Sequence, residues 1–400
     1  MMKNKIFYVI INYMSQGSNI LLNVLMMRML SPSELGLLSL AKILFQSAEY
    51  SHLGSRFALD RMLPSSDKFE SLALLNSAIF FCTIFGLGYI FVCYLYFGNE
   101  SIYILFSIAG LFFVLANFFK VYSRAKSNYF HLNVVTTVLV FFPILIQIIQ
   151  LISGGYHGFV HSFFYGYLIS FVFIILLNRG LLLKIDPKKF FLVYKNKLAK
   201  PGFLLLISSF ISFMAMTFDR IIVGVFFSLD FLGYYSILLF FISLYLIMPA
   251  VISELALPDI MKFSNGNNIF VVIKKYAIVT FLSSIFISIG VFCLFDLIIN
   301  IIDPKYVFLK NEVFLALLIL IPYTFTPFVI HYFNAIDKQF FLMIINLLAF
   351  IIYISFLLLY INFYSDVNLL GLVFIKVLYF FIQFLLLALF IFISRKRYGL

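Results

Sequence analysis

Four amide side chains follow one face of the first long apolar segment. They are Asn12, Gln16, Asn19 and Asn23, and their spacings of four, three and four residues put all of them on one stripe of an α-helix. Amides hydrogen-bond well to the hydroxyl groups of sugars. The alternative is that these amides only hold membrane helices together. Their regular spacing beside a charged helix favours a hydrated path.

Charged side chains gather in the next apolar segment. A second stripe there, interrupted at Leu53, consists of Lys42, Gln46, Glu49, Arg56 and Asp60. Further charges lie in later segments, with Asp219 beside Arg220, and Lys376 seven residues before Gln383. Ionisable groups within a membrane span usually face a bundle interior or an aqueous cavity. Lysine and arginine are suited to phosphate.

These polar side chains predict one hydrated vestibule between the two halves of the chain. Amides of the first span, charges of the second and the lysine of the last span would line it. The candidate binding residues are Asn12, Gln16, Asn19, Asn23, Lys42, Gln46, Arg56, Arg220 and Lys376.

Composition indicates the element type that must position these residues. The chain has 400 residues, of which 64% are hydrophobic and 11% are charged, whereas soluble domains are about 25% charged. It is therefore expected to be an all-α polytopic membrane protein. Apolar segments of about 20 residues lie at 6–29, 35–58, 72–97, 102–121, 131–152, 159–178, 203–227, 231–257, 277–299, 313–334, 340–361 and 369–394.

The positions of basic residues predict the orientation of these spans. With the amino terminus inside, most of the 28 Lys and Arg residues face the cytoplasm, and only Arg28, Lys305 and Lys310 face outward. Both termini are then cytoplasmic. The net charge of +12 is thus a topology signal and argues against nucleic acid as a partner.

An internal repeat predicts how the spans are grouped. The stretches SPSELGLLS at 31–39 and SLDFLGYYS at 228–236 align without a gap, and each joins the first two spans of its half. We expect a six-helix bundle at 1–178, a basic cytoplasmic connector at 179–200 and a second bundle at 201–400. An axis along the membrane normal would relate the two bundles.

Several stretches carry a resemblance to a known family. They are RMLSPSELGLLSLAKIL (28–44), HLGSRFALDRMLP (52–64), DRIIVGVFFSLDFLGYYSILL (219–239), IIDPKYVFLKNEVFLALLIL (301–320) and FNAIDKQFFLMIINLL (333–348). With them, the chain resembles polysaccharide (O-antigen) flippases of the Wzx type. That family lies in the superfamily that includes multidrug exporters of the MATE type.

The resemblance implies a function and a role for each candidate residue. Such flippases move undecaprenyl-pyrophosphate-linked oligosaccharide repeat units of O-antigen or capsule from the cytoplasmic to the periplasmic leaflet of the bacterial inner membrane, by alternating access. Lys42, Arg220 and Lys376 would meet pyrophosphate or acidic sugars, and the amides would meet the glycan. Glu49 and Asp219 are the candidates for coupling to protons or sodium ions. A polysaccharide polymerase and a chain-length regulator are possible partners.

Two other classes of protein compete with this reading. A MATE-like cation-coupled multidrug antiporter would need an acid-rich, aromatic pocket, whereas this chain offers several cations and many amides. A membrane glycan polymerase or glycosyltransferase would need a large extramembrane loop, and the longest here is the connector at 179–200. We therefore expect no enzyme, no catalytic residue, no metal site and no cofactor.

The orientation is testable by labelling single cysteines in intact cells. A membrane-impermeant thiol reagent should reach positions in 98–101 and 153–158 but not position 188, which the basic connector keeps inside. Labelling of position 188 from outside would overturn the topology.

Overall fold

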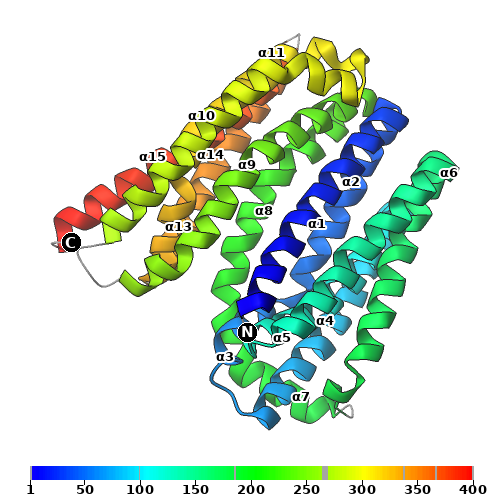
Figure 1. The fold of residues 1–400 in the computed structure, drawn as a ribbon, viewed down its shortest axis with the longest axis vertical. Coiled ribbons are helices and arrows are strands. Elements are labelled where there is room, and N and C mark those ends of the chain that lie inside the picture. Colours follow the sequence, from blue (N-terminus) through cyan, green and yellow to red (C-terminus); the bar gives the residue numbers. More distant parts are fainter. Residues whose placement is uncertain are drawn as a thin grey trace. The chain divides into compact units, whose positions relative to one another are not determined.

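The chain divides into two compact helical units. The computed structural model describes residues 2–98, 100–183, 186–263, 269–336, 338–364 and 367–398, and all regular elements in these ranges are helical (Figure 1). One unit is Met1–Ile207 and the other is Ser208–Leu400. This division falls inside α8 (Lys200–Phe226), so the predicted start of the second bundle at residue 201 stays a prediction.

The N-terminal unit is built from long helices and short connecting turns. Its elements are α1 (Met2–Met29), α2 (Pro32–Ser47), η1 (Ala48–His52), α3 (Ser55–Met62), α4 (Lys68–Phe97), α5 (Ser101–Ala125), α6 (Tyr129–Leu177), η2 (Arg179–Leu181), α7 (Pro187–Val193) and η3 (Tyr194–Ala199).

The second predicted span is not one helix. Helix α2 ends at Ser47, and Leu53 and Gly54 have left-handed φ values of 41° and 84°. The prediction of an unbroken helix over 35–58 is therefore wrong. A Cβ atom on Gly54 would lie 2.5 Å from the backbone of Gly202, so this close approach requires glycine. Apolar periodicity carries no signal for such a contact between distant segments.

Helix α6 contains the fifth and sixth predicted spans. Its backbone reverses at Gly155, where φ is 57°, and the two arms pack side by side (Figure 1). The Ser170 hydroxyl donates to the Val138 carbonyl at 2.9 Å. A Cβ atom on Gly166 would lie 2.9 Å from the Cα of Pro143. The predicted spans at 131–152 and 159–178 are thus confirmed as a tight hairpin.

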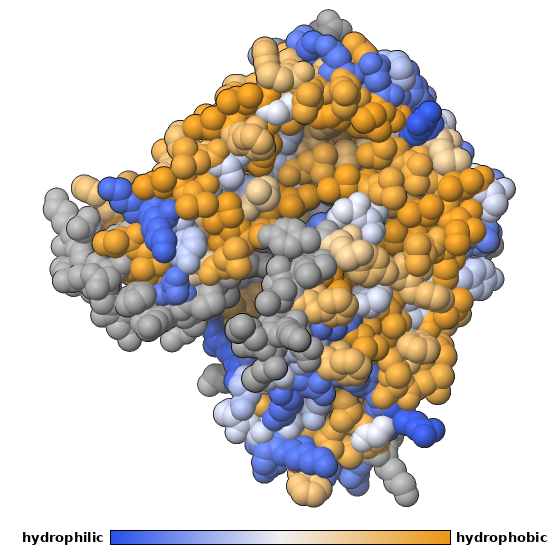
Figure 2. All heavy atoms as spheres, in the orientation of Figure 1, coloured by the Kyte–Doolittle hydropathy of each residue, from blue (hydrophilic) through white to orange (hydrophobic). Residues whose placement is uncertain are grey.

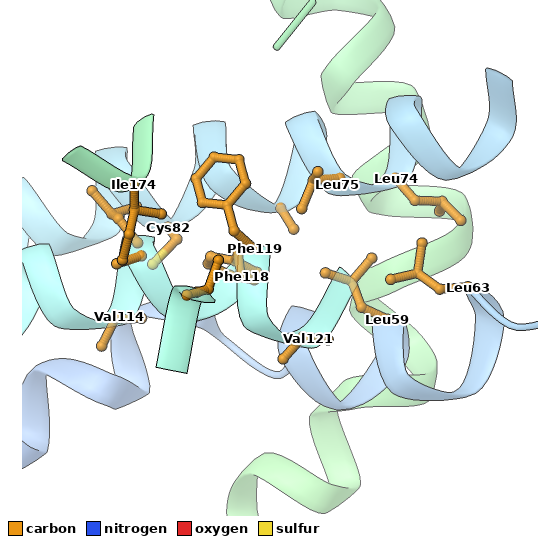
Figure 3. Close-up of a cluster of buried hydrophobic side chains, with 14 of the residues drawn as sticks. Leu59, Leu63, Leu74, Leu75, Cys82, Val114, Phe118, Phe119, Val121 and Ile174 are labelled. Carbon is orange, nitrogen blue, oxygen red and sulfur yellow. The ribbon is translucent and has the colours of Figure 1, made fainter. Parts of the chain in front are cut away.

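Apolar side chains from α3, α4, α5, α6 and η3 form the core of the N-terminal unit. Figure 3 shows Phe118 and Phe119 of α5 beside Leu75 and Cys82 of α4, with Leu59 of α3 and Leu63, which follows α3, nearby. Burying each large apolar side chain contributes about 1.5–3 kcal/mol. The packing holds the short helix α3 against α4 and α5 beyond the break in the second span.

The basic connector is fixed to α4. The Asn76 side chain donates to the Leu181 carbonyl at 2.9 Å and accepts from the Leu183 backbone N–H at 3.0 Å. Phe190 is buried, and Lys197 pairs with Glu70. The described residues of the connector therefore pack on the N-terminal unit.

The C-terminal unit continues α8 with α9 (Leu229–Phe263), α10 (Ile269–Ile302), α14 (Gln339–Phe363) and α15 (Leu369–Tyr398). Between α10 and α14 lie η4 (Pro304–Leu309), α11 (Lys310–Ala316), η5 (Leu317–Ile319), α12 (Leu320–Tyr323) and α13 (Thr326–Ala335), and the last four of these elements cover the tenth predicted span at 313–334. Pro322 and Pro327 flank the last break, which lies between α12 and α13. Proline disrupts helical hydrogen bonding, and this accounts for a break between the two prolines.

Each of the two repeat stretches contains a serine that caps the start of a helix. The Ser31 hydroxyl caps α2 by accepting from the Glu34 backbone N–H at 3.3 Å, and the Glu34 carboxylate accepts from the Ser31 N–H at 2.8 Å. The Ser228 hydroxyl accepts from the Phe231 N–H at 3.2 Å at the start of α9. Serine is a preferred N-cap residue. The repeat therefore marks equivalent helix starts in the two halves.

The helices are long and apolar enough for a membrane. Nine segments of the described chain have the length and composition of a span, and α6 counts as one of them although it contains two arms. The face in Figure 2 is mostly covered by hydrophobic residues, with hydrophilic residues mainly toward its margins. The chain is a multi-pass membrane protein.

The Gly54–Gly202 contact predicts a sharp cost for an added methyl group. Gly202→Ala should lower the free energy of unfolding by about 1–3 kcal/mol, because its Cβ would collide with the Gly54 carbonyl. Thermal unfolding in detergent, followed by circular dichroism, measures this. The control Gly88→Ala, with open space around its Cβ, should be neutral or stabilising. Equal melting temperatures for the two variants would contradict the close packing.

Candidate functional site

A buried ion pair joins two helices of the C-terminal unit. The Nζ atom of Lys376 on α15 lies 2.9 Å from Oδ2 of Asp219 on α8. The two side chains are 1% and 0% exposed. A buried charge is tolerated only where partners replace its hydration. The surroundings of both groups therefore decide whether this pair is stable.

Asp219 has a full set of hydrogen-bond donors. Its Oδ2 accepts from the Tyr235 hydroxyl at 2.6 Å and from the Tyr353 hydroxyl at 3.0 Å, besides Lys376. Its Oδ1 accepts from the backbone N–H of Arg220 at 2.9 Å. Hydrogen bonds to an ionised acceptor are stronger than neutral ones. These contacts stabilise the carboxylate form of Asp219.

The ammonium group of Lys376 is also saturated. Besides Asp219, it donates to the carbonyl oxygens of Ala215 at 3.0 Å and Met216 at 3.4 Å. An ammonium group has three donors, and these contacts use all of them. The Nζ atom also lies 5.2 Å from the centre of the Tyr353 ring. In this arrangement Lys376 has no N–H left for a ligand, and its predicted contact with substrate stays a prediction.

A second polar layer lies two helical turns away. Gln383 donates to the Asn346 side-chain oxygen at 3.0 Å, and Asn346 donates to the Ser212 hydroxyl at 3.3 Å. Ser212, Asn346 and Gln383 each lie seven residues from a member of the first layer on α8, α14 and α15. Lys376 and Gln383 thus share one face of α15, as their spacing predicts. The two layers hold α8, α14 and α15 in one register.

Sequence reasoning missed four members of these layers. Ser212, Asn346, Tyr235 and Tyr353 were not among the candidates. The seven-residue spacing from Asp219 to Ser212 was available as a signal. The tyrosines carried no signal, because the chain has 25 of them.

Arg220 differs from its neighbour Asp219. Its side chain is only partly buried, and its Nε atom is buried with no hydrogen-bond partner among the described residues. A guanidinium donor in this condition is suited to an anionic ligand. The binding role predicted for Arg220 stays a prediction.

The predicted amide stripe lies at the edge of the buried face of α1. Gln16 and Asn19 are exposed and Asn23 is half-buried, whereas the neighbouring Ser15 and Leu22 are buried. The side-chain NH₂ groups of Asn19 and Asn23 donate to backbone carbonyls one turn earlier, at 3.1 and 2.9 Å. Asn12 lies outside the described side chains. The three described amides thus form a polar strip along an accessible side of the helix.

Lys42 connects this strip to α2. Its Nζ atom donates to Oδ1 of Asn23 at 3.3 Å and contacts the Met26 sulfur at 3.6 Å. Gln46, one turn further along α2, is exposed. The structure therefore brings a lysine of the second span to the amides of the first. We call Gln16, Asn19, Asn23, Lys42 and Gln46 the polar strip.

The remaining members of the predicted second stripe form ion pairs beyond the strip. Arg56 pairs with Glu49 across the break at Leu53 and Gly54. Asp60 pairs with Arg124 of α5 at 2.5 Å. The stripe is not continuous, because the helix that would carry it is broken. Within the described residues, no three His, Cys, Asp or Glu side chains are grouped to hold a metal ion.

Comparison with known proteins identifies solved structures of similar architecture. No protein-family model matches the chain, and no curated protein does. A solved structure of the lipid II flippase MurJ, in an inward closed conformation, matches 96% of this chain and 87% of its own with a TM-score of 0.74 and 16% identity. The chain has the fold of MATE and MurJ transporters.

Further solved structures extend this likeness. An inward-facing multidrug resistance MATE family transporter of the MOP superfamily matches 96% of both chains, with a TM-score of 0.70 and 11% identity. A MOP superfamily transporter from Pyrococcus furiosus, described as having a binding pocket of reverse polarity, matches 99% of this chain and 95% of its own, with a TM-score of 0.64 and 12% identity. At these identities the likeness establishes the fold alone.

The buried ion pair predicts opposite effects of single and double substitutions. Lys376→Met or Asp219→Asn alone should destabilise the protein by about 3–5 kcal/mol, because each leaves one buried charge without its counter-ion. The double variant should recover most of this loss. Melting temperatures of purified protein in detergent measure all three. Additive losses in the double variant would contradict a paired charge.

Proposed function

We propose that this chain is a flippase that moves undecaprenyl-pyrophosphate-linked oligosaccharide repeat units from the cytoplasmic to the periplasmic leaflet of a bacterial inner membrane. The supporting observation is the polar strip, an accessible row of amides beside a lysine on otherwise apolar helices. The fold match to a structure described as a lipid II flippase supports the same class.

The chemistry of the strip fits a glycan attached to phosphate. Exposed Gln16, Asn19 and Gln46 offer both donors and acceptors to sugar hydroxyls. Lys42 brings a positive charge to the same strip, and Arg220 offers a second cation on α8. We propose that the amides contact the sugars and that these two cations attract the pyrophosphate or acidic sugars.

The charge pairing of the acids argues against a multidrug antiporter. A cationic drug requires an acid whose charge is not already balanced. Glu49 pairs with Arg56, Asp60 with Arg124 and Asp219 with Lys376. None of these three acids therefore offers an uncompensated negative charge, although MATE structures share the fold.

The remaining parts of the proposal follow from the predicted topology and the family resemblance. Both termini lie in the cytoplasm, and two six-helix bundles expose the substrate site alternately to the two sides of the membrane. Glu49 would couple transport to protons or sodium ions, or Asp219 would couple it to protons. A polymerase and a chain-length regulator would receive the exported units.

The charge of Lys42 provides the direct test. Lys42→Ala should reduce glycan display about tenfold, because a hydrogen bond to a charged group contributes about 1.5–3 kcal/mol. The assay measures surface glycan, at matched protein levels, in cells that depend on this chain for export. Lys274→Ala, at an exposed lysine of α10, is the control and should be tolerated.

Two outcomes would contradict the proposal. Equal display by the two variants would remove Lys42 from the site. Export of a fluorescent organic cation by the wild-type protein in vesicles, without glycan translocation, would favour the multidrug antiporter.

A further inference from the structure

The ammonium group of Lys376 occupies a site built from oxygen atoms. One charged oxygen, Oδ2 of Asp219, and two neutral carbonyl oxygens, of Ala215 and Met216, surround it at 2.9, 3.0 and 3.4 Å. Carboxylate and backbone carbonyl oxygens are the ligands by which proteins replace the water shell of hard metal cations. The arrangement is therefore also suited to a monovalent metal ion.

One turn of α8 supplies all three oxygens. Ala215 and Met216 precede Asp219 by four and three residues, so their carbonyls point along the helix toward the turn that carries the carboxylate. A carbonyl oxygen has two lone pairs and can accept a second hydrogen bond beside its helical one. The oxygen site thus belongs to α8, and only the cation comes from α15.

We propose that Lys376 is the built-in cation of this site, and that the C-terminal unit consequently binds no sodium ion at Asp219. The single negative charge of Asp219 is balanced by the single positive charge of Lys376. A metal ion at the same oxygens would bring a second positive charge close to the ammonium in a buried environment, where repulsion is strong. Occupancy by lysine and by metal is therefore mutually exclusive.

The other polar neighbours do not provide a second anionic site. Tyr235 and Tyr353 approach Asp219 as donors, and the second layer of Ser212, Asn346 and Gln383 is uncharged. The backbone N–H of Arg220 is a further donor to the carboxylate. A metal cation would gain nothing from these groups that Lys376 does not already have. The exclusion of sodium from Asp219 does not depend on which substrate the protein transports.

The experiment measures the ion dependence of thermal stability in purified protein. The wild type, Lys376→Ala and the double variant Asp219→Asn with Lys376→Ala are melted in detergent by circular dichroism. Choline chloride is replaced stepwise by lithium, sodium or potassium chloride at constant ionic strength. Removing the lysine vacates the oxygen site and leaves Asp219 without a counter-ion.

We expect Lys376→Ala to gain several degrees in melting temperature, saturably, with at least one of the three metal ions. The wild type and the double variant should not respond, because one already contains its cation and the other lacks the carboxylate. An absent response in folded Lys376→Ala would overturn the proposal.

The wild-type protein provides a second measurement that does not require Lys376→Ala to fold. A saturable rise of its melting temperature with sodium that Asp219→Asn abolishes would overturn the proposal, since it would place a metal ion beside Lys376. A flat wild-type titration would support it even if Lys376→Ala could not be purified. Neither result depends on glycan export, so failure here is distinct from failure of the proposed function.

Discussion

The structure of the C-terminal unit depends on keeping two opposite charges out of water. In a membrane, a charged side chain without a partner is costly, so the position of Lys376 is restricted to the few places where Asp219 is within reach. Two tyrosine hydroxyls and two carbonyls complete the arrangement. Four helices, α8, α9, α14 and α15, are therefore bound to one relative position by the needs of a single pair.

The N-terminal unit follows a different principle. Its core is apolar, its helices approach closely at glycines, and exposed amides lie along α1 and α2. Three of its ion pairs, Arg56–Glu49, Arg124–Asp60 and Lys197–Glu70, are partly exposed. The N-terminal unit thus carries exposed amides and partly exposed ion pairs, whereas the C-terminal unit contains a fully buried pair.

Much of the fold could be predicted from the sequence because the bilayer imposes a strong length constraint. A run of about 20 apolar residues has few structural alternatives to a spanning helix. The α6 hairpin was predictable for this reason. The break at Leu53 and Gly54 was not, since it depends on backbone contact with Gly202, far away in the chain.

The candidate sites were predictable in part. Spacing correctly grouped Lys376 with Gln383, and the structure brings Lys42 to Asn23. The pairing of Lys376 with Asp219 was not predicted, because both were assigned separate roles and helical periodicity does not identify the partner on another helix. The same limit applies to Tyr235 and Tyr353, whose importance comes entirely from the acid that they contact.

The serine caps of α2 and α9 have a consequence for the history of the chain. Two halves that arose by duplication of one gene would diverge freely at lipid-facing positions, where many apolar residues are interchangeable. A helix start is less forgiving, since loss of a serine cap costs about 1 kcal/mol. Ser31 and Ser228 would then persist as traces of the common ancestor.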